Sequence, residues 1–190
     1  MDKRLRVIKC FFDNQFINSN NQKYSSVVHS HTFEHVYDPL VFIQYISDLL
    51  NNGDTHIFSI PNLYKYLVNN FTNTLNFEHS YFLTEYFCDY LLAKNKFRIV
   101  EKYYFNEHSI FYATVKDDSI KEPTLSNKYN EYKLLFLNFI DHYYSEINRI
   151  NLILKDVDSN SNLYVFGAHI FTQFLVSIGL NLDKIISVLD

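Results

Sequence analysis

Glycine is scarce in this chain, with three among 190 residues, and this scarcity limits which ligands the sequence can hold in the usual way. Turns rich in glycine commonly let bare backbone approach phosphates and adenosine. No G-x-G-x-x-G run occurs, and Gly167-Ala168 after a short apolar run needs only a tight strand-to-helix turn. The sequence therefore contains no nucleotide-binding loop of the familiar kind.

Cysteine is also rare, and long apolar runs are missing. Cys10 and Cys88 lie far apart with no C-x-x-C spacing, so we expect neither a disulfide framework nor a cysteine zinc site. This use of cysteine indicates a reducing compartment. No apolar run approaches the ~20 residues that span a bilayer. The charged start, Met1 to Lys9, is not followed by the apolar segment of a signal peptide. We expect a cytoplasmic protein with no membrane partner.

Basic residues show no excess. The 17 Lys and Arg against 21 Asp and Glu give a net charge of −4, and they are spread along the chain, so we expect no nucleic-acid partner. Aromatic residues are abundant, with 16 Tyr and 18 Phe, and the hydrophobic content of 47% is enough for a core. The length predicts one domain with a small appendage.

Strand and helix patterns alternate along the first 116 residues. Apolar runs predict strands at Leu5–Phe12, Tyr24–His29, His56–Ile60, Phe97–Phe105 and Ser109–Val115. Apolar spacing and capping residues predict helices that begin at Asp38-Pro39, span Leu63–Asn73 and run from Thr84 to about Lys94. This order resembles the second half of a doubly wound sheet.

The remainder of the chain predicts a separate appendage. Residues 117–128 are polar, contain Pro123 and are typical of a linker, and Tyr129–Lys155 has the spacing of a long amphipathic helix. Residues 163–189 predict a βαβ unit. We therefore expect an α/β fold: a partial, Rossmann-like doubly wound sheet in residues 1–116, a linker at 117–128, and a long helix with a βαβ unit in 129–190.

One histidine cluster follows the second predicted strand. His31, Glu34 and His35 form an H-x-x-E-H sequence, which in inverted zincins places two zinc-binding histidines on one helix. Here the predicted helix begins only at Asp38-Pro39, so we assign no metal ligand, and a zinc hydrolase ranks third among the hypotheses. The carboxyl end of a strand is nevertheless where open α/β sheets bind ligands.

Two further histidines have acidic or polar neighbours. Glu78 beside His79 has the composition of an oriented general base, although a surface pair without a role is the default interpretation. His108 lies in the predicted turn between the last two strands of the first region and is equally ambiguous by itself.

Two linked passages resemble class I S-adenosylmethionine-dependent methyltransferases. Residues 24–39 are similar to the family's passage after the fourth strand, with a polar loop, the Glu34-His35 pair and Asp38-Pro39 opening a helix. Residues 49–62, with Gly53 and the final Pro61-Asn62, resemble the passage that follows. The resemblance implies S-adenosylmethionine as cofactor, with His31, Glu34 and His35 lining its cleft.

The resemblance extends to sugar C-methyltransferases. Residues 76–82 (Asn-Phe-Glu-His-Ser-Tyr-Phe) are similar to their Y-x-E-H-x-S-Y-F segment, with Asn76 in the place of the catalytic Tyr. This implies His79 as the base, Glu78 as its orienting carboxylate, and His108 and Tyr81 as substrate-binding residues. The implied substrate is a nucleotide-linked sugar or a sugar of a surface polysaccharide.

The family's beginning is missing from this sequence. Neither the glycine-rich loop, nor the acidic residue that holds the ribose, nor the N-terminal zinc-binding cysteines are found, and Leu5–Phe12 corresponds to the third strand. We therefore expect a chain that starts midway through the fold and stops early. The alternative function is a non-catalytic remnant or partner-binding module, and a second chain or a second copy would complete the sheet.

Overall fold

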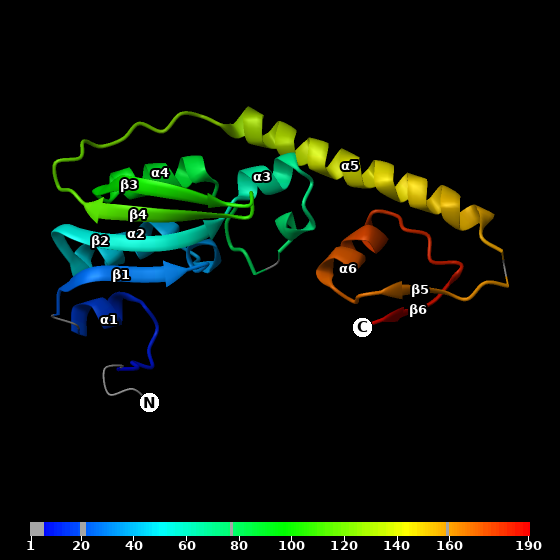
Figure 1. The fold of residues 1–190 in the computed structure, drawn as a ribbon, viewed down its shortest axis with the longest axis horizontal. Helices are drawn as coiled ribbons and strands as arrows, with labels where there is room; N and C mark the ends of the chain where they lie inside the picture. The colour runs from blue at the N-terminus through cyan, green and yellow to red at the C-terminus, as the bar shows by residue number, and fades with distance from the viewer. Residues whose placement is uncertain (1–5, 20–21, 77, 159) are drawn as a thin grey trace. The chain divides into compact units, whose positions relative to one another are not determined.

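Four strands form one mixed sheet in the computed structural model, which describes residues 6–19, 22–76, 78–158 and 160–190. The strands are β1 (Tyr24–Ser30), β2 (Leu50–Pro61), β3 (Phe97–Phe105) and β4 (Ser109–Lys116). Their order is β1-β2-β4-β3, with β1 parallel to β2, and with β4 antiparallel to both β2 and β3 (Figure 1). The parallel pair and the antiparallel hairpin are the parts of the doubly wound sheet that the sequence predicts.

Helix α2 (Pro39–Leu49) connects the two parallel strands and begins where its sequence predicts. The side chain of Asp38 accepts a hydrogen bond from the backbone N–H of Val41 at 2.9 Å, and Pro39 occupies the first helical turn. An N-cap of this kind satisfies a donor that the helix itself leaves without a partner, and proline there loses no helical hydrogen bond. The β1–α2–β2 unit therefore positions the loop between Ser30 and Asp38 at one end of the sheet.

The predicted strand at Leu5–Phe12 is wrong for its described part. Residues 6–12 form no strand, and the chain instead enters helix α1 (Asn14–Ser19). Asp13 begins this helix, because its Oδ1 accepts a hydrogen bond from the backbone N–H of Phe16 at 3.0 Å. An apolar run forms a stable strand only with a neighbouring strand to pair with, and residues 6–12 have none among those described.

The helix predicted over Leu63–Asn73 is shorter than its apolar spacing indicates. Helix α3 spans Leu63–Val68, and a 3-10 turn follows at Thr72–Thr74. Asn70 lies between them with φ of 54°, a left-handed conformation that ends a helix and that asparagine tolerates better than most residues.

Helices α2 and α4 (Glu85–Lys94) pack against each other, and also against β2 and β3 respectively. The core between them consists of apolar side chains from both helices and the sheet, with Phe33 and Leu83 from loops. The buried members from the two helices and the sheet are Ile43, Ile46, Leu50, Phe58, Ile60, Cys88, Leu92, Phe97, Ile110 and Tyr112. This core stabilises the sheet from one side and supports the loop after β1.

A second compact unit comprises Leu63–Glu78 and Ser126–Asp190. It contains α5 (Tyr129–Asp156), β5 (Leu163–Phe166), α6 (Ile170–Ser177) and β6 (Ile185–Leu189), and β5 pairs in parallel with β6. Leu67, Phe139 and Tyr143 form its buried centre. The predicted α/β class, the partial sheet, the long helix and the βαβ unit are thus confirmed. No helix among the described residues combines the length and apolar character needed to cross a membrane.

Lys116 at the end of β4 supports the C-terminal turn of α2, and its replacement gives a first testable prediction. Its Nζ donates to the backbone carbonyls of Ser47 at 2.6 Å and Leu50 at 3.2 Å. A cation at a helix C-terminus is favourable, so Lys116→Met should lower the free energy of unfolding by about 1–2 kcal/mol. Urea denaturation measures this, with Lys121→Met in the exposed linker as the control. Equal midpoints for the two variants would contradict the prediction.

Candidate functional site

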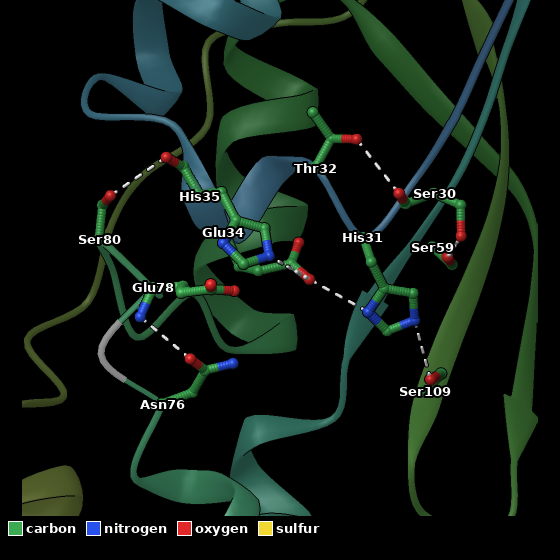
Figure 2. Close-up of polar contacts among 10 residues, drawn as sticks. All are labelled: Ser30, His31, Thr32, Glu34, His35, Ser59, Asn76, Glu78, Ser80 and Ser109. Atoms are coloured by element: carbon green, nitrogen blue, oxygen red, sulfur yellow. Dashed lines mark hydrogen bonds and ion pairs between the residues drawn. The ribbon is translucent and has the colours of Figure 1, made fainter. Parts of the chain in front are cut away.

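A group of polar side chains gathers where β1 and β2 end, at the carboxyl edge of the parallel pair. The hydroxyls of Ser30 and Ser59 lie 2.7 Å apart, and the backbone N–H of His31 donates to the carbonyl of Ser59 at 3.0 Å (Figure 2). Open α/β sheets bind their ligands at this edge. The fold therefore places the predicted cluster of His31, Glu34 and His35 in the position where a ligand is expected.

His31 turns the chain out of the sheet in a strained conformation. Its φ is 46°, in the left-handed region that only a few per cent of residues other than glycine adopt, among which histidine, asparagine and aspartate are the most frequent. The bond to Ser59 and a bond from Thr32 Oγ1 to the carbonyl of Ser30, at 3.1 Å, hold the turn on both sides. Strain of this kind persists only where the surroundings enforce it, and it is concentrated at functional sites.

The imidazole of His31 connects a buried carboxylate to a serine on another strand. Its Nδ1 lies 3.1 Å from Oε1 of Glu34, which is 1% exposed, and its Nε2 lies 3.2 Å from Oγ of Ser109 at the start of β4. Oγ of Ser109 in turn lies 2.7 Å from Nδ1 of His108. Figure 2 shows the links from Glu34 to His31 and from His31 to Ser109.

One assignment of protons satisfies this whole chain of contacts. The carboxylate of Glu34 accepts from His31 Nδ1–H, the Ser109 hydroxyl donates to His31 Nε2, and His108 Nδ1–H donates to the Ser109 oxygen. The order serine, histidine, carboxylate is that of hydrolase triads. Ser109 is only 3% exposed and its backbone lies in the β4 ladder, so this arrangement orients His31 and does not present a nucleophile.

Glu34, His35 and His79 form a second group on the other side of the same carboxylate. One ligand atom from each of them lies within 4.8 Å of the others, and the rings of His35 and His79 meet edge to face at 5.0 Å. Two hydrogen bonds attach the residue after His79 to this turn: Ser80 N–H donates to the carbonyl of Glu34 at 2.9 Å, and Ser80 Oγ to that of His35 at 3.1 Å. The buried Glu34 is thus shared by three histidines.

The structure brings together five of the residues that the sequence predicts for the site: His31, Glu34, His35, His79 and His108. Tyr81 is exposed, and so is Glu78, whose backbone N–H donates to Oδ1 of Asn76 at 3.0 Å. A carboxylate oxygen of Glu34 lies within 4.8 Å of a ring nitrogen of His79. The roles of Glu78, Tyr81 and the other site residues stay predictions.

Ser109 and a histidine pair are site neighbours that sequence reasoning missed. His29 and His56 lie on paired strands with their Nε2 atoms 3.0 Å apart, and Phe58 stacks on both rings. Burial lowers the pKa of His29 from 6.5 to about 4, and burial together with the nearby His29 lowers that of His56 well below its ordinary value. Local sequence patterns give no signal for this pair, because the two histidines lie 27 residues apart on different strands.

The three glycines do not form a nucleotide cradle. Gly53, Gly167 and Gly179 have φ of 94°, 99° and 110°, and a Cβ added at each would meet nothing within 4 Å. They serve left-handed turns and not a close approach of backbone to a ligand. The described residues therefore offer no glycine-rich backbone loop against which a nucleoside could lie.

Comparisons with known proteins give limited information. No family model matches the chain, and neither does any curated protein. Among solved structures, it is similar to magnesium protoporphyrin IX methyltransferase from Synechocystis PCC 6803, crystallised with bound SAH, at 18% sequence identity and a TM-score of 0.40. The match covers 53% of this chain and 48% of that one, so the chain spans about half the length of that protein. A likeness of this size assigns no activity to the chain.

Proposed function

We propose that this chain carries the later, substrate-side part of an S-adenosylmethionine-dependent methyltransferase that acts on a nucleotide-linked or surface-polysaccharide sugar. The supporting observation is that residues 24–62, which resemble the family, fold as strand, loop, helix and parallel strand. That unit places His31, Glu34 and His35 at the ligand-binding edge of the sheet. The antiparallel β3–β4 hairpin matches the terminal strand pair that the resemblance implies.

His79 is the proposed base. A methyl acceptor on a sugar must lose a proton, and a positioned imidazole is the commonest group to take it. Glu34 lies beside His79 and would stabilise the imidazolium that forms, which supports this role for His79. S-adenosylmethionine would supply the methyl group, and the contacts to its nucleoside would come from outside these 190 residues.

The alternative is a non-catalytic domain that binds a partner. It is supported by the lack of a glycine-rich loop in the sequence and by the position of β1, which pairs with β2 alone among the described strands. An open strand edge presents unpaired N–H and C=O groups that another chain can pair with.

Calorimetric titration with S-adenosylmethionine separates the two functions. The methyltransferase proposal predicts saturable heat with a dissociation constant of about 0.1–1 mM, weak because part of the site is missing, equivalent to roughly −4 to −5.5 kcal/mol. No heat at millimolar ligand would contradict it and favour the non-catalytic alternative.

An assay of methyl transfer to nucleotide sugars, in which the released S-adenosylhomocysteine is measured, tests whether His79 is the base. His79→Gln should lower the rate by about 10²–10⁴. His142→Gln, an exposed position on α5, is the matched control and should keep the rate of the original chain. An unchanged rate in His79→Gln would remove His79 from the role of base.

A further inference from the structure

We propose that Glu34, His35 and His79 form a binding site for a divalent transition-metal ion such as Zn²⁺. Their ligand atoms gather within 4.8 Å of one another. Two imidazoles and one carboxylate are the ligand set of many catalytic zinc sites and of other open transition-metal sites. This inference does not depend on methyl transfer, because the same three side chains would bind the ion whatever the reaction. While an ion is bound, the ring nitrogen of His79 that holds it cannot accept a proton, so the role of base proposed above applies to the metal-free chain.

The orphaned oxygen of Glu34 is the observation that points to a ligand. The side chain is 1% exposed, and its Oε2 is buried without a hydrogen-bond partner among the residues that the structure describes. Its other oxygen, Oε1, is engaged by His31 Nδ1 at 3.1 Å. A buried carboxylate oxygen with nothing to satisfy it carries a large desolvation cost, which a cation would offset.

The neighbouring contacts orient this carboxylate as they do in known metal sites. Carboxylates that ligate metals are usually held by hydrogen bonds from outside the ligand set. Here His31 supplies that bond and is itself held by Ser109 at 3.2 Å. His31 is thus a positioning residue, which turns one oxygen of Glu34 toward the ion while it binds the other (Figure 2).

The backbone holds the three ligands in one place. Glu34 and His35 are consecutive in the 3-10 turn Phe33–His35, whose first residue is buried in the core. The segment that carries His79 is attached to that turn by the two hydrogen bonds from Ser80, to the carbonyls of Glu34 and His35. The ligands therefore come from two loops that are bonded to each other, so only side chains have to adjust when an ion binds.

That adjustment is small. Zinc bonds of about 2.0–2.2 Å put neighbouring ligand atoms roughly 3.4 Å apart in a tetrahedron. Nε2 of His35 lies 3.9 Å from Oε1 of Glu34, the oxygen that His31 holds, so this imidazole is already beside the carboxylate whose Oε2 would bind the ion. All three ligand atoms lie within 4.8 Å of one another. Rotation of the His35 and His79 imidazoles, both partly accessible to solvent, can shorten these distances to the roughly 3.4 Å of a zinc tetrahedron.

This ligand set differs from the one that the H-x-x-E-H sequence indicates. In inverted zincins both histidines of the motif bind the metal from one helix. Here His31 lies before the turn with a left-handed backbone, and its two ring nitrogens face Glu34 and Ser109. The third ligand is His79, which is 44 residues beyond His35 in the sequence and which the motif does not contain.

Three protein ligands leave a coordination position for an oxygen of water or of a substrate hydroxyl. Mg²⁺ should bind poorly, because it prefers octahedral oxygen ligands. Zn²⁺, with its affinity for imidazole, should bind best among the common divalent ions other than copper.

Equilibrium dialysis against 10 µM Zn²⁺ at pH 7.5, with metal analysis of the protein, tests the site. The purified chain, stripped first with chelator, should bind one Zn²⁺ per molecule, and the double variant His35→Gln/His79→Gln should bind none. His142→Gln/His169→Gln removes two histidines from the C-terminal unit and should keep stoichiometric zinc. Circular dichroism of each variant verifies that it is folded.

No stoichiometric zinc in the original chain would overturn the proposal, and so would full zinc binding in His35→Gln/His79→Gln. Preference for Mg²⁺ over Zn²⁺ would also overturn it. If the double variant fails to fold, thermal melting of the original chain replaces it: Zn²⁺ at 100 times its dissociation constant should raise stability by about 2.7 kcal/mol, and absence of a shift counts against the site. Zinc binding without S-adenosylmethionine binding would uphold the metal site and contradict the proposed function alone.

Discussion

Lowering the pH from 7 to 5 is expected to reduce the free energy of unfolding by about 2 kcal/mol through His29, and by a further amount in the same direction through His56. Burial holds the pKa of His29 at about 4 and that of His56 well below its ordinary value of 6.5. In the unfolded chain both imidazoles take up protons as the pH falls through 6.5, whereas in the folded state they stay neutral. Since the unfolded state then binds more protons, stability is full above pH 6.5 and is lost as the pH falls toward 4.

The geometry explains why neither ring accepts a charge. The two Nε2 atoms lie 3.0 Å apart, so one carries a proton and the other accepts it, and protonation of both rings would place two like charges side by side. His56 is 0% exposed, and its ring packs on Phe58 and Phe97. His29 contributes about 2 kcal/mol between pH 7 and 5, and His56 contributes in the same direction.

Urea denaturation at pH 7, 6 and 5 measures this dependence. The double variant His29→Leu/His56→Leu should lose most of the slope in this range, while His142→Gln, on the exposed surface of α5, should keep it. Carboxylates such as Glu85, whose pKa is lowered by its bonds to Lys102 and Tyr104 against the effect of burial, act at lower pH. A slope that persists unchanged in the double variant would assign the pH dependence to other groups.

Replacement of Phe58 by alanine is expected to destabilise the sheet by about 3–5 kcal/mol. Phe58 is 1% exposed in the middle of β2, and its ring stacks on Tyr112 at 4.8 Å and on His56 at 4.6 Å. The substitution removes the ring from the centre of this stack. The tightly packed core around it can close only part of the resulting cavity.

Phe111→Ala is the matched control, because Phe111 lies on the neighbouring strand β4 but is 43% exposed. It should lose less than about 1 kcal/mol. In chemical denaturation, the difference in free energy of unfolding between the two variants measures the effect of burial, because both replace a phenylalanine of the same sheet by alanine. Similar losses for both would mean that the aromatic stack contributes little to the stability of the sheet.

Local signals in the sequence predict most elements of the fold. Asp38-Pro39 specifies the start of α2 because the cap and the fixed proline φ act within one turn, and the spacing of apolar residues indicates α5 nearly to its last residue. The strand at Leu5–Phe12 was predicted from an apolar run alone. A run of that kind says nothing about whether a partner strand exists, and here none of the described strands pairs with it.

The sequence predicts several of the residues at the site, and it does not predict which of them contact one another. His31, Glu34 and His35 stand together in the sequence, so a pattern finds them. Ser109 lies 78 residues from His31 and joins it only because β4 is inserted beside β2, which local patterns do not encode. For the same reason, sequence reasoning paired His79 with its neighbour Glu78 and gave no sign that the distant Glu34 also comes within ligand distance.

The segment Leu63–Glu78 has a consequence for how this protein is synthesised. It interrupts the first compact unit in the sequence and belongs to the second, where Leu67 packs with Phe139 and Tyr143 of α5. At about 5–20 residues per second, a ribosome takes several seconds to progress from this segment to α5. Throughout that interval Leu67 lacks the aromatic side chains that bury it, so the nascent chain exposes an apolar stretch that a chaperone could recognise, and the second unit can assemble only after α5 and the segments that follow it have been translated.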